Sequence, residues 1–166
     1  MKATKPRAIT PFVNRVRVSK ILPGEDVRKL GYPERLKMET RQFPTVFCDR
    51  HLELGPAGEA LVYYAFDFRC AATMKLNLLL GYDGPVKVWY DRKAIFRDPK
   101  GTNPARPEDA VAPFAAKAGE HEMLVALGSH GAAWGVFLRL ERTDVSKAVL
   151  RKNPQSVVMP ENAERP

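Results

Sequence analysis

The sequence predicts an all-β protein, an antiparallel two-sheet β-sandwich of jelly-roll type with about eight short strands and little helix. Fourteen prolines and eleven glycines are spread along the 166 residues, and such residues divide a chain into short elements joined by turns. The apolar runs between these turns are short, and several alternate apolar with polar residues as half-buried strands do. No apolar run reaches the ~18 residues of a membrane-spanning helix, so we expect no membrane partner.

The stretch from Leu76 to Phe96 shows this pattern most clearly. Two apolar runs, Leu76–Leu80 and Val86–Tyr90, flank a turn sequence at 81–85 that contains two glycines and a proline. The polar residues that follow Tyr90 predict a second tight turn before a short strand at 94–96. We therefore expect a hairpin followed by a third strand, all antiparallel.

Six other segments have the composition of strands: Phe12–Val18, Phe43–Cys48, Leu61–Phe68, Ala110–Phe114, Glu122–Leu127 and Ala133–Arg142. The clearest is Leu61–Phe68, in which aromatic and aliphatic residues alternate so that Val62, Tyr64 and Phe66 fall on one face. Leu61, Tyr63, Ala65 and Asp67 fall on the opposite face.

The chain divides into three regions. Residues 1–11 are expected to form a flexible basic arm, residues 12–143 the β-sandwich domain, and residues 144–166 a polar tail or linker. Within the domain, the residues at 25–29 and 34–40 are each expected to form a helical turn or short helix.

The net charge of +8 comes mainly from the N-terminal end, where the first 50 residues hold twelve Lys or Arg against five Asp or Glu. Such an excess can attract nucleic acid. No RNA- or DNA-binding motif accompanies it, so a nucleic-acid partner is not expected. The first residues, MKATKPRAITPF, lack the apolar centre of a signal peptide.

Cys48 and Cys70 are the only cysteines, and the sequence leaves open whether they pair. Cys48 and His51 have the spacing of two zinc ligands, but no second pair of ligands follows at a matching spacing. We therefore expect no zinc site.

Three motifs carry a resemblance to a known family. The segment at 81–96, GYDGPVKVWYDRKAIF, is similar to a strand with an x-V-x-V-W-x-N/D-G-K turn. The segment at 118–127, AGEHEMLVAL, is similar to a later strand of the form x-G-x-N-x-L-x-V-x-L, and the segment at 133–140, AWGVFLRL, is similar to the final strand. On these motifs, residues 43–142 resemble the galactose-binding-domain-like β-jelly-roll modules. The chain departs from the pattern at Arg92, where the family usually has the turn glycine, and at His121, where it often has asparagine.

Such modules accompany carbohydrate-active enzymes as sugar-binding or packing domains. The resemblance therefore implies a non-catalytic carbohydrate-binding module whose partner is carbohydrate, and it favours a secreted or periplasmic location. It also implies that calcium can serve as a structural ion, with Asp49, Glu53 and Glu141 as candidate ligands. The alternative is a structural β-sandwich that docks on a catalytic domain or on a second copy of itself.

Sugars stack on flat aromatic faces, while Asp, Asn and Arg side chains bond their hydroxyls. The ligand-binding residues expected on this basis are Tyr82, Asp83, Trp89, Asp91, Arg97, Asn103 and Arg106. The turn at 82–83 and the irregular polar loop expected at 97–108 should share one rim of the sandwich, because the third strand returns toward that end of the hairpin. Trp89 shares a face with Lys87, which leaves its exposure open, whereas Trp134 shares a face with aliphatic residues and is expected in the core.

We expect no catalysis, because the sequence contains no G-x-S-x-G elbow, no H-E-x-x-H motif and no phosphate-binding glycine loop. A further alternative is a small glycan-active hydrolase that uses a pair of carboxylates. Its candidates are Glu53, Asp67, Asp83 and Glu122, and their separation, which decides this chemistry, cannot be derived from the sequence.

Overall fold

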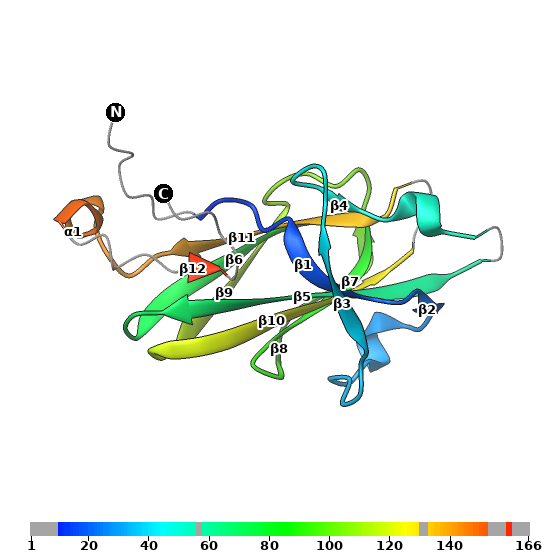
Figure 1. Cartoon of the computed structure of the whole chain (residues 1–166), viewed down its shortest axis with the longest axis horizontal. Helices are drawn as coiled ribbons and strands as arrows, with labels where there is room; N and C mark the ends of the chain where they lie inside the picture. The colour runs from blue at the N-terminus through cyan, green and yellow to red at the C-terminus, as the bar shows by residue number, and fades with distance from the viewer. Residues whose placement is uncertain (1–9, 56–57, 130–132, 153–158, 161–166) are drawn as a thin grey trace.

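The computed structural model describes residues 10–55, 58–129, 133–152 and 159–160. Two antiparallel β-sheets form a sandwich (Figure 1). The predicted all-β fold with two antiparallel sheets is confirmed. Among the described residues, no helix is long and apolar enough to cross a bilayer.

The larger sheet has eight strands, six of which follow the order β3-β1-β5-β10-β7-β8. In that order they are Met38–Gln42, Arg15–Ser19, Ala60–Cys70, Gly119–Gly128, Gly84–Tyr90 and Lys93–Thr102. The two-residue strands β2 (Leu22–Pro23) and β12 (Met159–Pro160) both pair with β5. The long strand β5 therefore organises this sheet.

The smaller sheet has four strands in the order β4-β11-β6-β9. In that order they are Cys48–Asp49, Gly135–Arg142, Met74–Tyr82 and Ala110–Ala116. The helices of the described residues are short: η1 (Val27–Lys29), η2 (His51–Glu53) and α1 (Lys147–Lys152).

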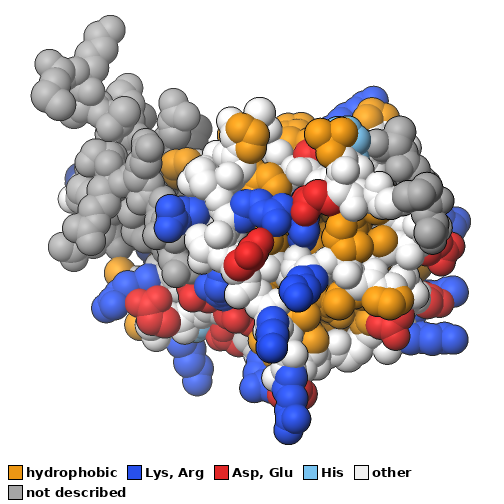
Figure 2. Space-filling view, turned by 45° about the vertical axis from the view of Figure 1, so that its right-hand side comes forward, with side chains coloured by type: hydrophobic (Ala, Val, Ile, Leu, Met, Phe, Trp, Pro, Cys, Tyr) orange, Lys and Arg blue, Asp and Glu red, His pale blue; other side chains and the backbone are white. Residues whose placement is uncertain are grey.

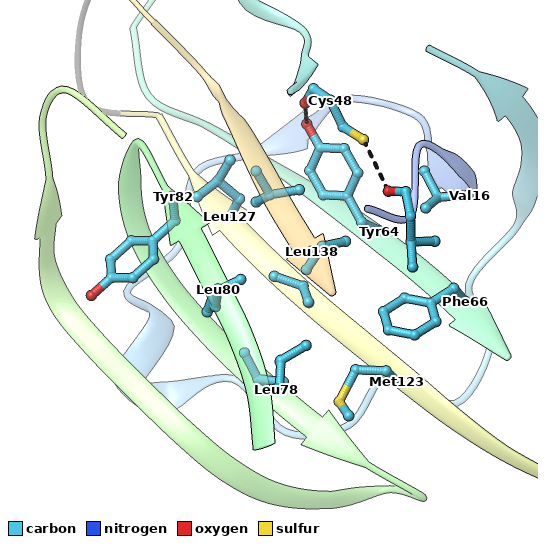
Figure 3. Close-up of a cluster of buried hydrophobic side chains, with 14 of the residues drawn as sticks. Val16, Cys48, Tyr64, Phe66, Leu78, Leu80, Tyr82, Met123, Leu127 and Leu138 are labelled. Carbon is cyan, nitrogen blue, oxygen red and sulfur yellow. Dashed lines mark hydrogen bonds between the residues drawn. The ribbon is translucent and has the colours of Figure 1, made fainter. Parts of the chain in front are cut away.

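The main core lies between the two sheets. The alternation in β5 directs one set of buried side chains toward it: Val62, Tyr64, Phe66 and Phe68. Figure 3 shows the centre of this core, where side chains of both sheets meet: Val16, Tyr64, Phe66, Leu78, Leu80, Met123, Leu127 and Leu138. The buried hydroxyl of Tyr64 donates to the carbonyl of Cys48 at 2.9 Å, which satisfies the polar group that this aromatic ring carries into the core.

A second, smaller core covers the outer face of the larger sheet. The opposite face of β5 presents Leu61, Tyr63 and Ala65, which belong to one apolar cluster with Trp89 of β7. The segment 22–38, which contains β2 and η1, contributes further side chains to this cluster. Both faces of β5 are therefore covered, which explains why this strand is apolar at almost every position.

The expected hairpin between 76–80 and 86–90 is wrong. β6 belongs to the smaller sheet, between β11 and β9, whereas β7 belongs to the larger sheet, between β10 and β8. The chain crosses between the sheets at Asp83, whose backbone N–H donates to the carbonyl of Gly135 at 3.1 Å. A turn sequence bends the chain in either arrangement, so it does not reveal which partners the flanking strands take.

Three local predictions also differ from the structure. β3 begins at Met38, inside the segment 34–40 that was expected to form a helical turn. These residues form a strand because pairing with β1 supplies their backbone hydrogen bonds. Of the strand expected at 43–48, only Cys48 lies in a strand, the two-residue β4 that pairs with β11. β8 continues to Thr102, so the first half of the loop expected at 97–108 is a strand paired with β7.

Part of each expected terminal region is tied to the sandwich. Thr10, in the expected arm 1–11, is buried, and its N–H donates to the carbonyl of Leu140 at 2.8 Å. Residues 1–9 of that arm lie outside the described residues. In the expected tail 144–166, β12 pairs with β5.

The two cysteines do not form a disulfide: both are buried free thiols. Burial raises the pKa of Cys48 to about 12 and the pKa of Cys70 to about 11. Both thiols therefore stay protonated at neutral pH and act as small apolar side chains.

Candidate functional site

The loop between β8 and β9, residues 103–109, lies at the rim where the chain crosses between the sheets. Thr102, at the end of β8, pairs with Gly84 at the start of β7, and its hydroxyl donates to the carbonyl of Tyr82. The loop therefore begins beside Tyr82 and Asp83, as the sequence predicted, although a different strand arrangement brings it there.

Asp109 fixes the backbone of this loop. Its carboxylate accepts the backbone N–H of Arg106 at 2.7 Å, and its own N–H donates to the Arg106 carbonyl at 3.3 Å. Glu108 forms an ion pair with Arg139 of β11. The side chains of Asn103 and Arg106 are exposed on this fixed backbone.

Gly81 of β6 allows the loop to pass close to the smaller sheet. A Cβ atom at this position would lie 2.1 Å from the carbonyl oxygen of Arg106. We therefore expect Gly81→Ala to displace the loop and to lower the free energy of unfolding by about 2–3 kcal/mol, measured by urea denaturation. Gly31→Ala is the control, because a Cβ atom there meets nothing within 4 Å. Equal stability of the two variants would show that the loop does not approach Gly81.

Three of the expected ligand-binding residues are buried. Tyr82 and Trp89 are each 3% exposed and Asp83 is 0% exposed, so none of them offers a surface to a sugar. Tyr82 lies at the edge of the main core with its hydroxyl directed away from it (Figure 3), and this hydroxyl donates to Asp98 at 2.7 Å. Trp89 packs against Tyr32, with the ring centroids 6.4 Å apart.

Two more of the expected residues lie away from the rim. Arg97 is exposed, but it lies within β8, opposite Lys87 of β7. Asp91 is at the opposite end of β7, in the turn that leads to β8. The structure therefore brings together only Asn103 and Arg106, which share the loop, as exposed members of the expected site.

Asp91 instead holds His121 in place. Nδ1 of His121 lies 2.6 Å from a carboxylate oxygen of Asp91, and Nε2 lies 2.7 Å from the carbonyl oxygen of Lys117. Both neighbours accept hydrogen bonds, so the doubly protonated ring fits this position. Burial of the ring lowers the pKa of His121, but the bonds to Asp91 and Lys117 outweigh that effect and raise the pKa above its usual 6.5.

The raised pKa of His121 predicts a pH-dependent stability. The folded state binds the proton more tightly than the unfolded chain, so the contribution is fully present below about pH 6.5 and is lost as the pH rises through the folded pKa. Urea titrations between about pH 5.5 and 8.5 should show this decline, and His121→Gln should reduce it. A folded pKa of 6.5 or lower, measured by NMR, would contradict this expectation.

The carboxylates that were candidate calcium ligands do not form one site. Asp49 pairs with Gly135 of β11, whereas Glu141 lies six residues further along that strand, about 20 Å away at the usual rise per residue. Both carboxylate oxygens of Glu53 accept hydrogen bonds from Arg50. Across the described part of the chain, no group of three or more His, Cys, Asp or Glu side chains is placed to hold a metal ion.

A cleft of about 520 Å³ lies at the other edge of the larger sheet. Its lining comes from the segments 18–21, 37–41 and 50–53, which belong to β1, β3, η2 and the chain beside them. Figure 2 turns this side of the molecule forward and shows basic, acidic and hydrophobic side chains close together on it. No motif joins the three segments in the sequence, and the only signal was the basic excess of the first 50 residues.

No family model and no curated protein matches the sequence, but the structure is similar to parts of solved proteins. A β-glucosidase from Kluyveromyces marxianus matches with a TM-score of 0.55 and 12% identity, over 82% of this chain and 18% of that protein. An anti-sigma factor domain-containing protein matches with a TM-score of 0.51 and 15% identity, over 81% of this chain and 44% of that protein. Another such protein, from Clostridium clariflavum, matches with a TM-score of 0.50 and 16% identity, over 79% of this chain and 42% of that one.

These likenesses concern the fold, because the identities are low. The chain spans less than half the length of each of these proteins.

Proposed function

We propose that the chain is a non-catalytic carbohydrate-binding module of the galactose-binding-like jelly-roll type, with its site on the loop 103–109. The observation that carries this proposal is the exposure of Asn103 and Arg106 on a loop that Asp109 and the close approach to Gly81 hold in place. Polar groups on a fixed backbone bond sugar hydroxyls with little cost of ordering. The similarity of the fold to part of a glycosidase supports the same proposal.

The loop supplies both kinds of hydrogen-bonding group that sugar hydroxyls require. The guanidinium of Arg106 donates, and the amide of Asn103 both donates and accepts. None of the residues 103–109 is aromatic, so the loop itself offers no ring for stacking. We therefore expect weak binding, with a dissociation constant of ~0.1–1 mM.

Alanine substitution of Asn103 or Arg106 is expected to weaken glycan binding about tenfold, because each change removes a hydrogen bond worth roughly 1–2 kcal/mol. Arg69→Ala is the matched control, since Arg69 is also exposed but lies at the opposite end of the larger sheet. A glycan array selects the ligand, and calorimetric titration measures the affinity. Normal binding by both loop variants, with unchanged unfolding midpoints, would overturn this placement.

A second candidate function is docking on a catalytic domain or on a second copy of the chain. Phe12 and Phe47 pack on Phe137 of β11, with ring centroids 6.0 and 4.7 Å from that ring, and all three are only partly buried. Val46, before β4, and Val111, on β9, are exposed toward the two edges of the smaller sheet. Apolar surface of this kind is typical of interfaces. Light scattering after size-exclusion chromatography that shows a dimer, together with a negative glycan array, would favour docking.

We propose further that the module does not hydrolyse glycans. Asp67 and Glu122 lie directly opposite each other on β5 and β10, but Arg17 bonds both, at 2.9 and 3.2 Å. The guanidinium occupies the space between the carboxylates in which a glycosidic bond would have to lie. A panel of aryl glycosides should therefore show no turnover. Turnover that Asp67→Asn abolishes would contradict the proposal.

A further inference from the structure

The cleft beside β1 and β3 carries an excess of positive charge. Its lining includes four basic and two acidic side chains, namely Lys20, Lys37, Arg41, Arg50, Glu39 and Glu53. The arginines are neutralised within the cleft: Arg41 pairs with both Glu39 and Glu53, and Arg50 pairs with Glu53. The excess charge therefore resides on the two lysines.

Lys20 and Lys37 face each other at the open end of the β1–β3 pair. The last paired residues are Ser19 and Met38, so the next residue of each chain, Lys20 and Lys37, follows in register. Both are exposed, and neither forms an ion pair with any residue in the ranges that the structure describes. Like charges at opposed positions repel each other, and an anion between them would relieve this repulsion.

The inner wall of the cleft is rigid, because its arginine is buried and fully bonded. Arg50 is 3% exposed, and its Nη1 donates to the carbonyl of Ser19 at 2.7 Å while Nε and Nη2 donate to Glu53. Val18, Ile21 and Met38 line the remainder, and of these only Ile21 is exposed. A volume of about 520 Å³ suits a ligand with one or two sugar rings.

We propose that this cleft binds an acidic sugar of mono- or disaccharide size, whose carboxylate lies between Lys20 and Lys37. Its carbon skeleton packs against Ile21, as the C–H faces of a sugar pack on apolar side chains. Four strand spacings, or about 20 Å, separate β1 from β8 and thus this cleft from the loop 103–109. The site therefore does not depend on the function proposed for that loop.

Titration of the full chain with glucuronate, followed by calorimetry and amide NMR shifts, tests the proposal. The double variant Lys20→Gln/Lys37→Gln is expected to bind glucuronate at least about tenfold more weakly, because both charges that contact the carboxylate are lost. The matched control is Lys75→Gln/Lys93→Gln, which removes the same charge from two exposed lysines of β6 and β8 and should bind normally. Raising the salt to about 0.5 M should weaken binding to the parent chain.

The outcomes separate the proposal from its alternatives. Absence of glucuronate binding, equal binding of neutral glucose, or unchanged affinity in the Lys20/Lys37 variant would each overturn it. Inorganic phosphate serves as a second probe. Competition in which phosphate binds more weakly than glucuronate supports an acidic-sugar site, whereas tighter binding of phosphate would overturn the sugar assignment and identify a site for free oxyanions.

Discussion

Replacing Trp134 by alanine is expected to lower the free energy of unfolding by about 3–5 kcal/mol. Trp134 is 0% exposed and belongs to the main core between the two sheets. The substitution removes a whole indole from a packed interior, and the surrounding strands cannot collapse fully into the space. Its backbone carbonyl, which accepts the N–H of Arg50 at 2.7 Å, is unaffected by the change. Urea denaturation followed by circular dichroism measures the loss.

Two further variants test whether burial is the cause of this loss. Leu52→Ala removes a large apolar side chain that is 89% exposed, and the change should stay within about 0.5 kcal/mol. Trp134→Phe keeps an aromatic ring in the core. The indole N–H that it removes has no hydrogen-bond partner among the described residues. We therefore expect the free energy of unfolding to fall by less than about 2 kcal/mol. A Trp134→Ala variant as stable as the parent chain would show that the indole is not a core residue.

The alternation of apolar residues predicts the sandwich because it reports burial directly. In β5, every second side chain from Val62 to Phe68 faces the main core, and the same period runs from Trp134, just before β11, through Val136 to Leu140. The partners of each strand are not encoded in this local pattern. Leu76–Leu80 and Val86–Tyr90 have the sequence of a hairpin, yet they join different sheets. β6 pairs with β9 and β11, and β7 pairs with β10 as well as with its neighbour β8, so three of these four partners lie far away in the chain.

The candidate site was predicted less well, because exposure depends on which segments cover a strand. Trp89 and Lys87 share a face as predicted, but Lys87 lies over the indole at 5.4 Å and donates to the carbonyl of Leu30 in the segment 22–38. No local pattern in β7 reveals a cover that comes from more than fifty residues earlier. Asp83 lies in a turn sequence, where exposure is the usual outcome, but here the turn crosses between the sheets and the carboxylate is buried.

Replacing Glu53 by alanine is expected to lower the free energy of unfolding by about 3 kcal/mol, because it leaves the charge of Arg50 buried without its carboxylate. Nε and Nη2 of Arg50 donate to Glu53 at 2.8 and 2.9 Å, a bidentate pair in which the arginine is 3% exposed. After the change, Arg50 keeps the carbonyl of Ser19 as an acceptor. The side chain of Glu53 is itself 36% exposed, so water can enter its place, and we expect the lower end of the range for broken buried pairs.

Glu120→Ala is the matched control for this prediction. Glu120 also pairs with an arginine, Arg69 at 3.2 Å, but both side chains are more than 60% exposed. Solvent screens such a pair, so its loss should cost less than about 1 kcal/mol. Chemical denaturation at neutral pH compares the two variants with the parent chain. If Glu53→Ala costs no more than Glu120→Ala, the guanidinium of Arg50 must reach water, and the cleft beside β1 cannot have the rigid wall that the structure shows.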